Sequence, residues 1–487
     1  MAEGVGLLPL GLVVVVAGAL WIYGVNRTMN TVPPEALKLS PESNRWSKEH
    51  MRETYERVKK NPIDIKKHIP PKLDRRYIVV GGSGLVGGDI VAHLLARGQS
   101  AESIRIVDFA PLRRPEIIGV ASKVDVIKTD ITSPESVKAA FSKPWPASVA
   151  DLPLTVYHTA AAIRPGERSV KTYHRVARVN VSGTANVLAA AKEAGADIFI
   201  ATSSSSVAVK RMPFWRWPLP SLATNYVQVF NEDDFDQPLK AHDEFFGNYA
   251  RAKAEAERLV CAANHPNFRT GVVRPGNGIF GDVENDVTFG PTLKTGAVIS
   301  WTPHVIQNWI SSRNVSIAHL QFEAALNPAA RPVPPPCAGR PLLVTDPGPP
   351  IAFTDFYTMI ATLSATPITE TYPPPALMLM LAYAIEAWSD LIVNFPVLTK
   401  WFGWKEPTGD LAMLQPAVFT VSAYTICDDS RARKSVEEGG IGYKGVTTTL
   451  EGFCEQMAVW NERVERGEAG PLKGLKGEKK VAAPVVA

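Results

Sequence analysis

The chain has 487 residues, of which 45% are hydrophobic and 21% charged, and its formal net charge is +4. This length suits one large α/β enzyme or about two to three ordinary domains, and the small, dispersed charge gives no support for nucleic-acid binding. The four cysteines form no CxxC pair, so neither a disulfide framework nor a metal site is expected.

The first predicted element is a membrane anchor. The run Gly4–Val25 is apolar and carries no charge, and about 20 such residues span the hydrocarbon core as a helix. Trp21 and Tyr23 stand at one end, where aromatic rings favour the headgroup level. A cleaved signal peptide is the alternative, but the run has neither a basic segment before it nor a small-residue cleavage site after it.

The charges that flank this run predict its orientation. Lysines and arginines follow it and none precede it, so the positive-inside rule puts the body in the cytosol. We therefore expect a single-pass protein of the endoplasmic reticulum membrane. Residues 26–73 are mixed in charge, with a helix predicted at Ser47–Lys60 that Ser47 caps. This stretch is interpreted as a juxtamembrane stalk along the membrane surface or as a solvated linker.

Short buried strands then alternate with helical stretches. The predicted strands are Tyr77–Gly81, Ile104–Asp108, Val124–Lys128, Leu154–His158, Asp197–Thr202, Gly271–Arg274 and Leu342–Thr345. This alternation predicts an α/β fold with a doubly wound parallel Rossmann-type sheet. The expected domains are a dinucleotide-binding domain at 74–275, with an insert at 210–244 turned toward substrate, and a smaller, mainly substrate-binding domain at 276–470. The latter returns a strand near 342–345 to the sheet, and 471–487 is a flexible tail.

The first chemical motif is a glycine-rich turn between a strand and a helix. Gly81, Gly84 and Gly87 have the spacing GxxGxxG. Glycine allows the tight turn and the close approach of a pyrophosphate, and the helix N-terminus supplies N–H groups to the phosphates. A glycine-rich loop alone is weak evidence, but its place between a strand and a helix favours a dinucleotide site.

Acidic residues end the next two strands. Asp108 can accept hydrogen bonds from both adenosine ribose hydroxyls and repel a 2′-phosphate, which favours NAD over NADP. Its alternative role is to cap the following turn. Arg113 and Arg114 lie close enough in sequence to meet such a phosphate, so NADP stays open. Asp130 is expected to face the adenine or to be an ordinary turn residue.

Two further motifs carry catalytic groups. Tyr249 and Lys253 stand four apart on one helix face, and a nearby ammonium favours the ionised form of a tyrosine whose ordinary pKa is near 10. The run Ile200–Val207 ends a strand in four serines, and one hydroxyl there can hydrogen-bond the substrate oxygen. Taken alone, the Tyr249–Lys253 pair could be an ordinary helix surface and the serines a polar loop. The order of the motifs along the chain favours a dehydrogenase.

Together these motifs resemble the extended short-chain dehydrogenase/reductases. Within them the chain is most similar to the 3β-hydroxysteroid dehydrogenase/isomerases and the sterol-4α-carboxylate 3-dehydrogenases (decarboxylating). The resemblance rests on Tyr157–Ala161 (YHTAA), Val179–Leu188 (VNVSGTANVL), Arg274–Gly281 (RPGNGIFG) and the late Arg431–Lys434 near Ile441–Tyr443. Two departures concern the substrate side: RPGNGIFG has one extra residue, and an aromatic, Pro-rich insert lengthens the interval between Ser204 and Tyr249.

The resemblance implies specific roles. Tyr249 is the acid/base, Lys253 its partner, Ser204 the substrate-orienting hydroxyl, with Ser203 and Ser205 as alternatives, and Asn180 a structural or proton-relay group. The expected cofactor contacts are Gly81, Gly84, Leu85, Val86, Gly87, Asp108, Asp130, Ile131, Thr159, Ala160, Tyr249, Lys253 and Pro275.

The implied reaction is NAD-dependent oxidation of the 3β-hydroxyl of a sterol or sterol-like terpenoid, with loss of a neighbouring carboxylate as CO₂ where one is present. Two alternatives remain: an NADP-dependent reductase of a non-sterol ketone or aldehyde, and a non-catalytic dinucleotide-sensing protein. The expected partners are this hydrophobic substrate and the membrane, with a homodimer as one option for assembly.

The last predicted element is the apolar helix Pro375–Phe395. Glu386 and Asp390 interrupt one of its faces, which argues against a second membrane span. Two interpretations stay open: a buried helix of the substrate domain, or an interfacial helix through which a lipid substrate enters from the bilayer.

Overall fold

The computed structural model describes residues 4–120, 123–215, 221, 223, 225–286 and 289–470. Within this part of the chain, seven parallel strands form the central sheet in the order β12-β7-β5-β4-β1-β2-β3. They are β1 (Arg76–Val80), β2 (Ile104–Asp108), β3 (Asp125–Lys128), β4 (Leu154–His158), β5 (Ala196–Thr202), β7 (Arg269–Pro275) and β12 (Pro341–Val344). The strand order reverses between β1 and β4, so the predicted doubly wound Rossmann-type sheet is confirmed.

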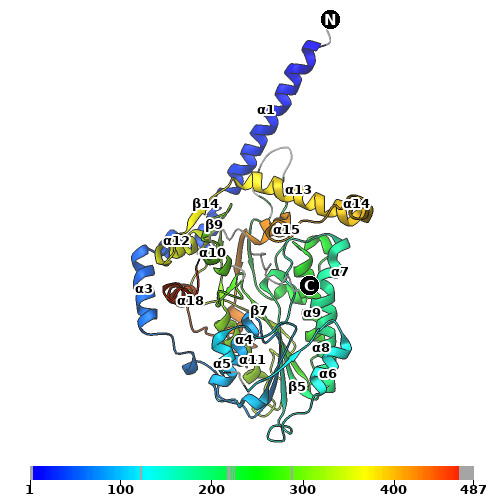
Figure 1. Ribbon diagram of the computed structural model, residues 1–487, viewed down its shortest axis with the longest axis vertical. Coiled ribbons are helices and arrows are strands. Elements are labelled where there is room, and N and C mark those ends of the chain that lie inside the picture. Colours follow the sequence, from blue (N-terminus) through cyan, green and yellow to red (C-terminus); the bar gives the residue numbers. More distant parts are fainter. Residues whose placement is uncertain are drawn as a thin grey trace.

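Helices cover both faces of this sheet (Figure 1). Side chains alternate along β1: Tyr77 and Val79 face one apolar core, whereas Ile78 and Val80 face the other. The first core contains side chains of α4 (Leu85–Ala96) and α11 (Ser312–Leu326), and the second contains side chains of α6 (Pro134–Ser142), α8 (Thr184–Glu193) and α9 (Asn248–Ala262). Burial on both faces explains why the strands are nearly continuous apolar runs.

In the described part of the chain, a second, smaller sheet has four strands. Its order is β13 (Ile351–Ala352), β10 (Ile306–Gln307), β15 (Tyr424–Cys427) and β6 (Val227–Phe230). Strand β6 comes from the predicted insert and pairs in parallel with β15, so the insert and the C-terminal part of the chain form one sheet. Two further pairs are β8 (Ile279–Phe280) with β11 (Ile310–Ser311), and β9 (Ala297–Ile299) with β14 (Thr369–Thr371).

Helix α3 (Lys48–Lys60) corrects the prediction of a stalk or solvated linker. The helix itself is where it was predicted, and the Ser47 hydroxyl accepts a hydrogen bond from His50 N at 3.1 Å. However, Met51, Tyr55 and Val58 are buried against α12 (Phe353–Leu363) and α18 (Thr449–Glu465). Its apolar face is therefore part of the body's core.

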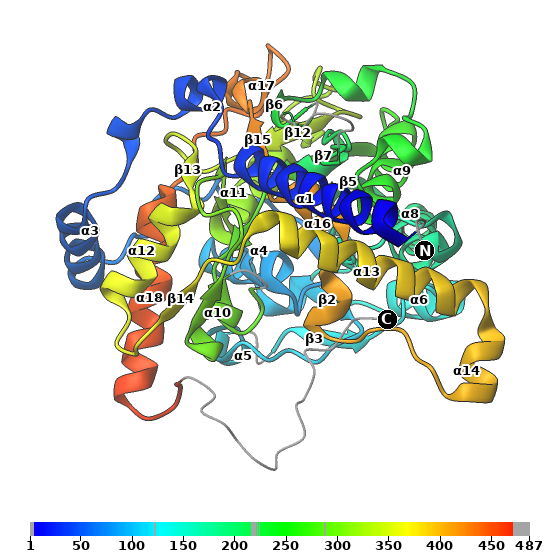
Figure 2. The same ribbon diagram turned by 90° about the horizontal axis from the view of Figure 1, so that it is seen from above.

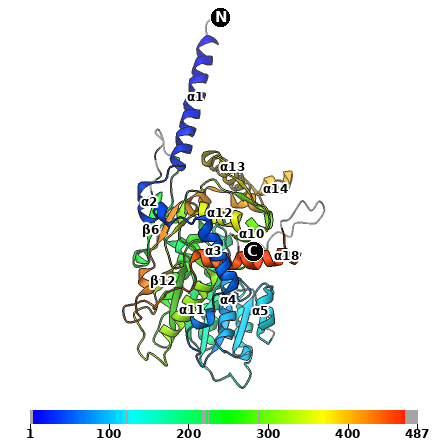
Figure 3. The same cartoon turned by 90° about the vertical axis from the view of Figure 1, so that its left-hand side faces the viewer.

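Helix α1 (Gly4–Met29) projects from the body, and α13 (Pro375–Asn394) lies across its base (Figures 1 and 3). The two helices pack against each other where α1 joins the body. The view from above shows that they lie on the same side of the molecule (Figure 2). One face of α13 is buried, with Ala376, Leu379 and Ala382 in an apolar core, and the opposite face is exposed, so α13 is only partly a core element.

Short helices complete the described residues. They are α2 (Pro34–Leu39), α5 (Pro115–Val120), α7 (Tyr173–Ala177), α10 (Phe289–Thr295), α14 (Pro396–Phe402), α15 (Asp410–Met413), α16 (Pro416–Val421) and α17 (Ser430–Arg433). The 3₁₀ turns are η1 (Glu42–Asn44), η2 (Ile65–Lys67), η3 (Ala101–Ser103), η4 (Val170–Thr172), η6 (Ser205–Val207), η7 (Asp233–Asp236) and η8 (His242–Glu244), and η5 (Arg178–Gly183) is π-helical. The predicted tail 471–487 lies outside the described residues.

Candidate active site

The glycine-rich turn connects β1 to α4 and leaves no room for side chains at two positions. Gly81 has φ +85°, and a Cβ added there would lie 2.6 Å from Ala160 N. A Cβ on Gly87 would lie 2.2 Å from the carbonyl oxygen of Gly81. The half-exposed backbone of Gly84 begins α4 without a side-chain cap, so the first amides of the helix are open to an anionic ligand.

The loop after β4 closes the other side of this turn. The Thr159 hydroxyl donates to Val80 O at 3.0 Å, and Thr159 N donates to the same carbonyl at 2.8 Å. Thr159 and Ala160 therefore pack directly against Gly81. Leu85 and Val86 are half-buried beside them, so these predicted contact residues gather at one edge of the sheet.

Asp108 binds the glycine-rich turn to the end of β2. Its Oδ2 accepts a hydrogen bond from Ser83 N and its Oδ1 one from Ala110 N, both at 2.9 Å. Burial raises the pKa of the carboxyl group, and these hydrogen bonds oppose the rise. Asp108 thus caps its turn, as one interpretation held, and also lies beside the glycine-rich turn, where a ribose would be bound.

The two arginines after Asp108 differ in their surroundings. Arg114 is buried; it contacts Asp89 at 2.7 Å and donates to Leu85 O at 3.1 Å. Arg113 is exposed. Arg114 is therefore engaged inside the protein, which leaves Arg113 as the arginine of this pair that is available at the surface.

Asp130 and Ile131 follow β3 at the same edge. Asp130 is exposed, and its Oδ1 accepts hydrogen bonds from the amide and hydroxyl of Thr132. Ile131 is buried, and its side chain would meet a Cβ added to Gly183. Pro275 ends β7 and is buried. All three residues lie at carboxyl ends of strands, where open α/β sheets bind ligands.

The serine turn and α9 bring the predicted catalytic groups together. Ser204 lies beside Tyr249, both are half-exposed, and the Ser204 hydroxyl is hydrogen-bonded to that of Ser206 at 2.8 Å. Ser203 and Ser205 are buried, and neither hydroxyl has a hydrogen-bond partner among the described residues. Among the three candidate serines, Ser204 is thus the one that meets the tyrosine from an accessible position.

Lys253 lies one helical turn beyond Tyr249 and is buried. Its Nζ donates to the carbonyl oxygen of Thr202 at 2.5 Å. Burial lowers the pKa of Lys253 to about 8, with Glu257 opposing the shift. Burial also raises the pKa of Tyr249 to about 12, and the neighbouring Ser204 hydroxyl opposes the rise. Burial therefore disfavours the charged form of both groups.

Asn180 makes two hydrogen bonds to the loop that follows β4. It lies in the π-helical turn η5, accepts a hydrogen bond from Ala162 N at 2.8 Å and donates one to Ala162 O at 3.0 Å. These two bonds fix the end of the loop that begins at Thr159. Single π-helical turns are frequent at functional sites. Here the turn places the side-chain amide of Asn180 against the loop beside the glycine-rich turn.

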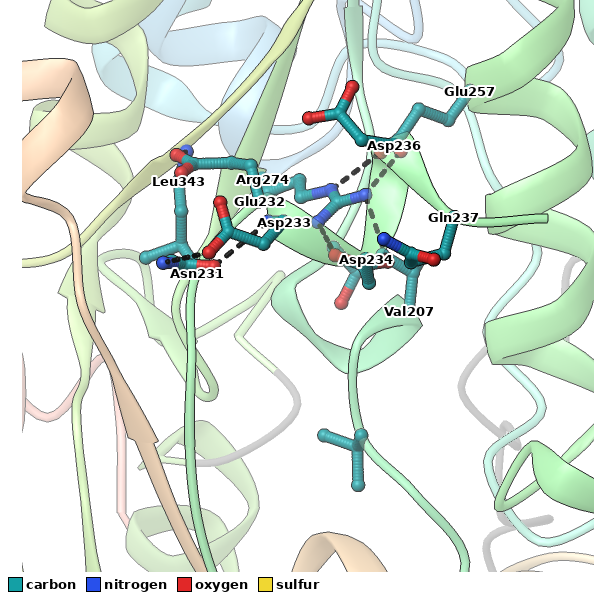
Figure 4. Close-up of polar contacts among 12 residues, drawn as sticks. Val207, Asn231, Glu232, Asp233, Asp234, Asp236, Gln237, Glu257, Arg274 and Leu343 are labelled. Atoms are coloured by element: carbon teal, nitrogen blue, oxygen red, sulfur yellow. Dashed lines mark hydrogen bonds and ion pairs between the residues drawn. The ribbon is translucent and has the colours of Figure 1, made fainter. Parts of the chain in front are cut away.

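A buried ion pair behind α9 was not predicted from the sequence (Figure 4). Arg274 of β7 contacts Glu257 at 2.5 Å and Asp234 at 2.6 Å. Arg274 and Glu257 are both buried, and Glu257 is one turn beyond Lys253 on α9. The spacing Tyr249, Lys253, Glu257 is the signal that could have identified it, because residues four apart share a helix face.

The residues at this edge fit a dinucleotide. A Cβ at Gly81 or Gly87 would occupy the space beside the glycine-rich turn. The carboxylate of Asp108 lies at the end of β2. An ammonium group has three N–H donors. Lys253 uses one of them for Thr202 O, so two remain for a ligand. The arrangement can hold a pyrophosphate, a ribose and a second ribose in sequence, with the Ser204–Tyr249 pair beyond them.

The sequence profile of the 3-beta hydroxysteroid dehydrogenase/isomerase family matches residues 78–367, from β1 into the segment after α12. This match covers more than half of the chain. The chain belongs to the 3-beta hydroxysteroid dehydrogenase/isomerase family. The resemblance inferred from the motifs is thereby confirmed, and the matched region of this family member contains the glycine-rich turn, Ser204, Tyr249 and Lys253.

Several curated relatives are similar to this family member over part of its length. The 3 beta-hydroxysteroid dehydrogenase/Delta 5→4-isomerase of Mycobacterium tuberculosis is 32% identical over 211 residues, which cover 42% of this chain and 48% of the relative. The 3 beta-hydroxysteroid dehydrogenase type 7 of Mus musculus is 31% identical over 217 residues, covering 42% and 50%. The chain therefore spans about half the length of these relatives. The 3beta-hydroxysteroid-dehydrogenase/decarboxylase isoform 1 of Arabidopsis thaliana is 27% identical over 348 residues, covering 67% and 71%.

Solved structures share the fold of this family member. The epimerase Mth375 of Methanothermobacter thermautotrophicus has a TM-score of 0.52 at 16% identity and covers 83% of this chain and 96% of its own. MoeE5 in complex with UDP-glucuronic acid and NAD has a TM-score of 0.51 at 16% identity and covers 80% and 99%. At this identity the likeness concerns the fold alone.

Proposed function

We propose that this family member is an NAD-dependent dehydrogenase that oxidises the 3β-hydroxyl of a sterol or sterol-like terpenoid to the ketone. The observation that carries the proposal is the position of the half-exposed Ser204 beside Tyr249, with Lys253 one helical turn away and bonded to Thr202 O. These groups stand at the carboxyl edge of the sheet, beyond the glycine-rich turn. The names of the similar bacterial, mammalian and plant proteins support the substrate class.

The residues divide the chemistry among them. Tyr249 accepts the proton of the substrate hydroxyl, and Ser204 holds that oxygen through a hydrogen bond. Because burial raises the pKa of Tyr249 to about 12, ionisation needs neighbouring positive charge, which the Lys253 ammonium supplies. Bound NAD supplies the hydride acceptor and a second positive charge. The substrate thus loses a proton from oxygen and a hydride from carbon.

Asp108 supports NAD as the cofactor. Its carboxylate lies at the end of β2 beside the glycine-rich turn, where a 2′-phosphate would meet negative charge. Arg114 is engaged by Asp89, which weakens the argument that two arginines would attract NADP. NADP remains a secondary cofactor through Arg113.

Loss of a neighbouring carboxylate is a finer part of the proposal. The plant relative whose name includes a decarboxylase activity aligns over 67% of this chain. Oxidation of a 3β-hydroxyl beside a carboxylate gives a β-keto acid, which loses CO₂ without a further catalytic group. We therefore extend the proposal to 4-carboxysterols.

A second candidate function is an NADP-dependent reductase of a non-sterol ketone. The 4-hydroxy-2-methyl-3-oxo-4-farnesyl-3,4-dihydroquinoline-1-oxide ketoreductase of Stigmatella aurantiaca is 29% identical over 200 residues, covering 41% of this chain. The same Tyr249 would then donate its proton to the carbonyl oxygen. A non-catalytic dinucleotide sensor is less supported, because it would not need a lysine buried at a desolvation cost beside a tyrosine.

Helix α1 supports a membrane location. The stretches Gly11–Leu39 and Pro375–Asn394 are each long and apolar enough to cross a membrane, among the residues described. Side chains from Gly11 to Leu20 are exposed, whereas Val25 and Met29 are buried in the body. We propose that α1 is a single-pass anchor in the endoplasmic reticulum membrane, with the body in the cytosol.

The test uses the full-length protein in membranes. NAD or NADP is supplied with 3β-hydroxysterols, some of which carry a 4-carboxylate, and ketone and CO₂ are measured. Ketone formation with NAD is expected, and CO₂ release only from the carboxylated substrates. Reduction of ketones with NADPH, without sterol oxidation, would favour the reductase; no turnover of any substrate would contradict both.

A further inference from the structure

The exposed face of α13 is apolar from Leu377 to Leu391, and the exposed Asn394 follows at the end of the helix. Its exposed side chains recur at helical spacing, and none is charged: Leu377, Met380, Leu381, Ala384, Ala387, Trp388 and Leu391. We call these seven residues the α13 stripe. A surface helix of a water-soluble protein normally turns its polar face outward. The outward face of α13 has the opposite character, which marks it as a contact surface.

The acidic residues of α13 point toward the body instead. Glu386 forms a two-point ion pair with Arg168, in which Nη2 and Oε2 are 2.6 Å apart. After α14, Glu406 forms a second two-point pair with Arg175 at 2.7 and 2.8 Å. Bidentate pairs fix orientation as well as position. These two pairs therefore hold the segment with the α13 stripe facing outward.

The apolar surface continues beyond the end of α13. In and beside α14, five large side chains are exposed: Phe395, Val397, Trp401, Phe402 and Trp404. Tryptophan and phenylalanine are typical of the apolar face of helices that lie in a membrane interface. The composition of this continuation favours a lipid surface over a second protein.

Helix α1 places the bilayer beside this surface. Trp21 stacks on Trp215 with ring centroids 5.0 Å apart, and α1 and α13 pack together at that level (Figures 1 and 3). The uncharged run is bounded by Glu3 on one side and by body packing from Trp21 on the other. At about 1.5 Å per residue, the helix between these points is roughly 25 Å long, less than the roughly 30 Å of the hydrocarbon core. A helix of this length draws the body up to the bilayer.

We infer that the α13 stripe and these five residues at α14 contact the membrane. They lie at the boundary between headgroups and acyl chains, in the leaflet nearest the protein body. The occupant of this surface is lipid. The inference rests on the proposed anchor α1 and goes beyond it, because it assigns a second membrane contact that sets how the body is oriented. Helix α13 also packs on α16, and Ala417 of α16 lies 3.6 Å from the position of a Cβ on Gly247, two residues before Tyr249. The lipid surface is thus one helix layer from the catalytic helix.

The test is a depth measurement on the full-length protein in phosphatidylcholine vesicles. The four native cysteines, Cys261, Cys337, Cys427 and Cys454, are buried, so a nitroxide label reacts selectively with one introduced cysteine. Leu381→Cys and Phe402→Cys probe the surface, and Val14→Cys probes α1. Val333→Cys is the matched control: it is exposed and follows Pro332, whose carbonyl binds Arg269 at the amino edge of the sheet. Collisions with oxygen, which is lipid-soluble, are compared with those of a water-soluble nickel chelate.

We expect labels at 14, 381 and 402 to favour oxygen over nickel several-fold relative to the label at 333. Nickel access at 381 and 402 equal to that at 333, with 14 still shielded, would overturn the inference and leave the anchor intact. Nickel access at 14 as well would overturn the anchor together with the inference. Dipolar broadening between labels at 402 at low protein density would show that a second copy, rather than lipid, covers the surface.

Discussion

Lys253 Nζ donates a hydrogen bond to the carbonyl oxygen of Thr202, 2.5 Å away. This bond joins the catalytic helix α9 to the end of β5, two residues before Ser204. The ammonium therefore holds the serine turn in place while two of its N–H bonds remain for a cofactor ribose. The role of each group can be separated by substitution.

Tyr249→Phe is expected to lower turnover by about 10²–10⁴-fold, the usual contribution of a general acid–base group, with dinucleotide binding retained. Turnover and the dissociation constant of NAD are measured on the same preparation. Ser204→Ala should also lose rate, whereas Ser205→Ala, whose hydroxyl is buried, serves as the control. Equal losses in the two serine variants would contradict the choice of Ser204.

Lys253→Met is expected to abolish most activity and to stabilise the fold. Burial lowers the pKa of Lys253 from its usual 10.5 to about 8, so below pH 8 the folded state carries a desolvated charge. Between pH 8 and 10.5 the unfolded chain holds the proton that the folded protein has released, and stability rises with pH. Denaturant titrations should show this rise in the wild type, and a flatter profile with a stability gain of about 1–3 kcal/mol in the variant. A variant that is less stable at pH 7 would argue against the buried ammonium.

Glu257→Gln removes one partner of the buried pair with Arg274. Breaking such a pair costs about 3–5 kcal/mol, and Lys253 also loses the charge that opposes its low pKa. We expect the variant to be less stable than the wild type. Its activity should begin to fall at a lower pH than that of the wild type, because Lys253 loses its proton at a lower pH. Glu255→Gln on the same helix is the control, since Glu255 pairs with Arg251 in a half-exposed position. An unchanged pH profile in Glu257→Gln would indicate a purely structural role.

Asp108→Ser is expected to weaken NAD by about one to two powers of ten, because hydrogen bonds to a charged group contribute about 1.5–3 kcal/mol. The same change removes the charge that repels a 2′-phosphate, so kcat/KM with NADP should rise. Adding Arg113→Ala should cancel that rise, whereas Arg114 is engaged by Asp89 and should not contribute. A wild type that prefers NADP would favour the reductase.

The central sheet could be predicted from the sequence because its strands are buried on both faces. Tyr77–Val80 alternate between two cores, so nearly every position must be apolar, and the pattern stands out from the helices around it. The candidate site could also be predicted from the sequence. Parallel strands end at the same edge of the sheet, so motifs at the strand ends lie close together. The roles of Asn180, Ser204, Tyr249 and Lys253 stay predictions until they are tested by substitution.

The sequence could not predict what lies across from a side chain. Helical spacing places Glu257 on the face of Tyr249 and Lys253, but it does not show that Arg274 of β7 lies 2.5 Å from Glu257. The sequence also does not show that Arg114 contacts Asp89. Apolar composition likewise does not distinguish a core helix from one whose apolar face points outward, as in α13. The burial of Met51 and Tyr55 in α3 depends on α12 and α18, which follow far along the chain.

The pairing of β6 with β15 orders events during synthesis. Residues 227–230 leave the ribosome before residues 424–427. Strand β6 therefore lacks its partner strand until β15 has been synthesised. Contacts this distant along the chain form late and expose unpaired strand edges in the meantime. A chain truncated before Tyr424 would keep the seven strands of the central sheet but lack β15, the strand that joins β6 to β10.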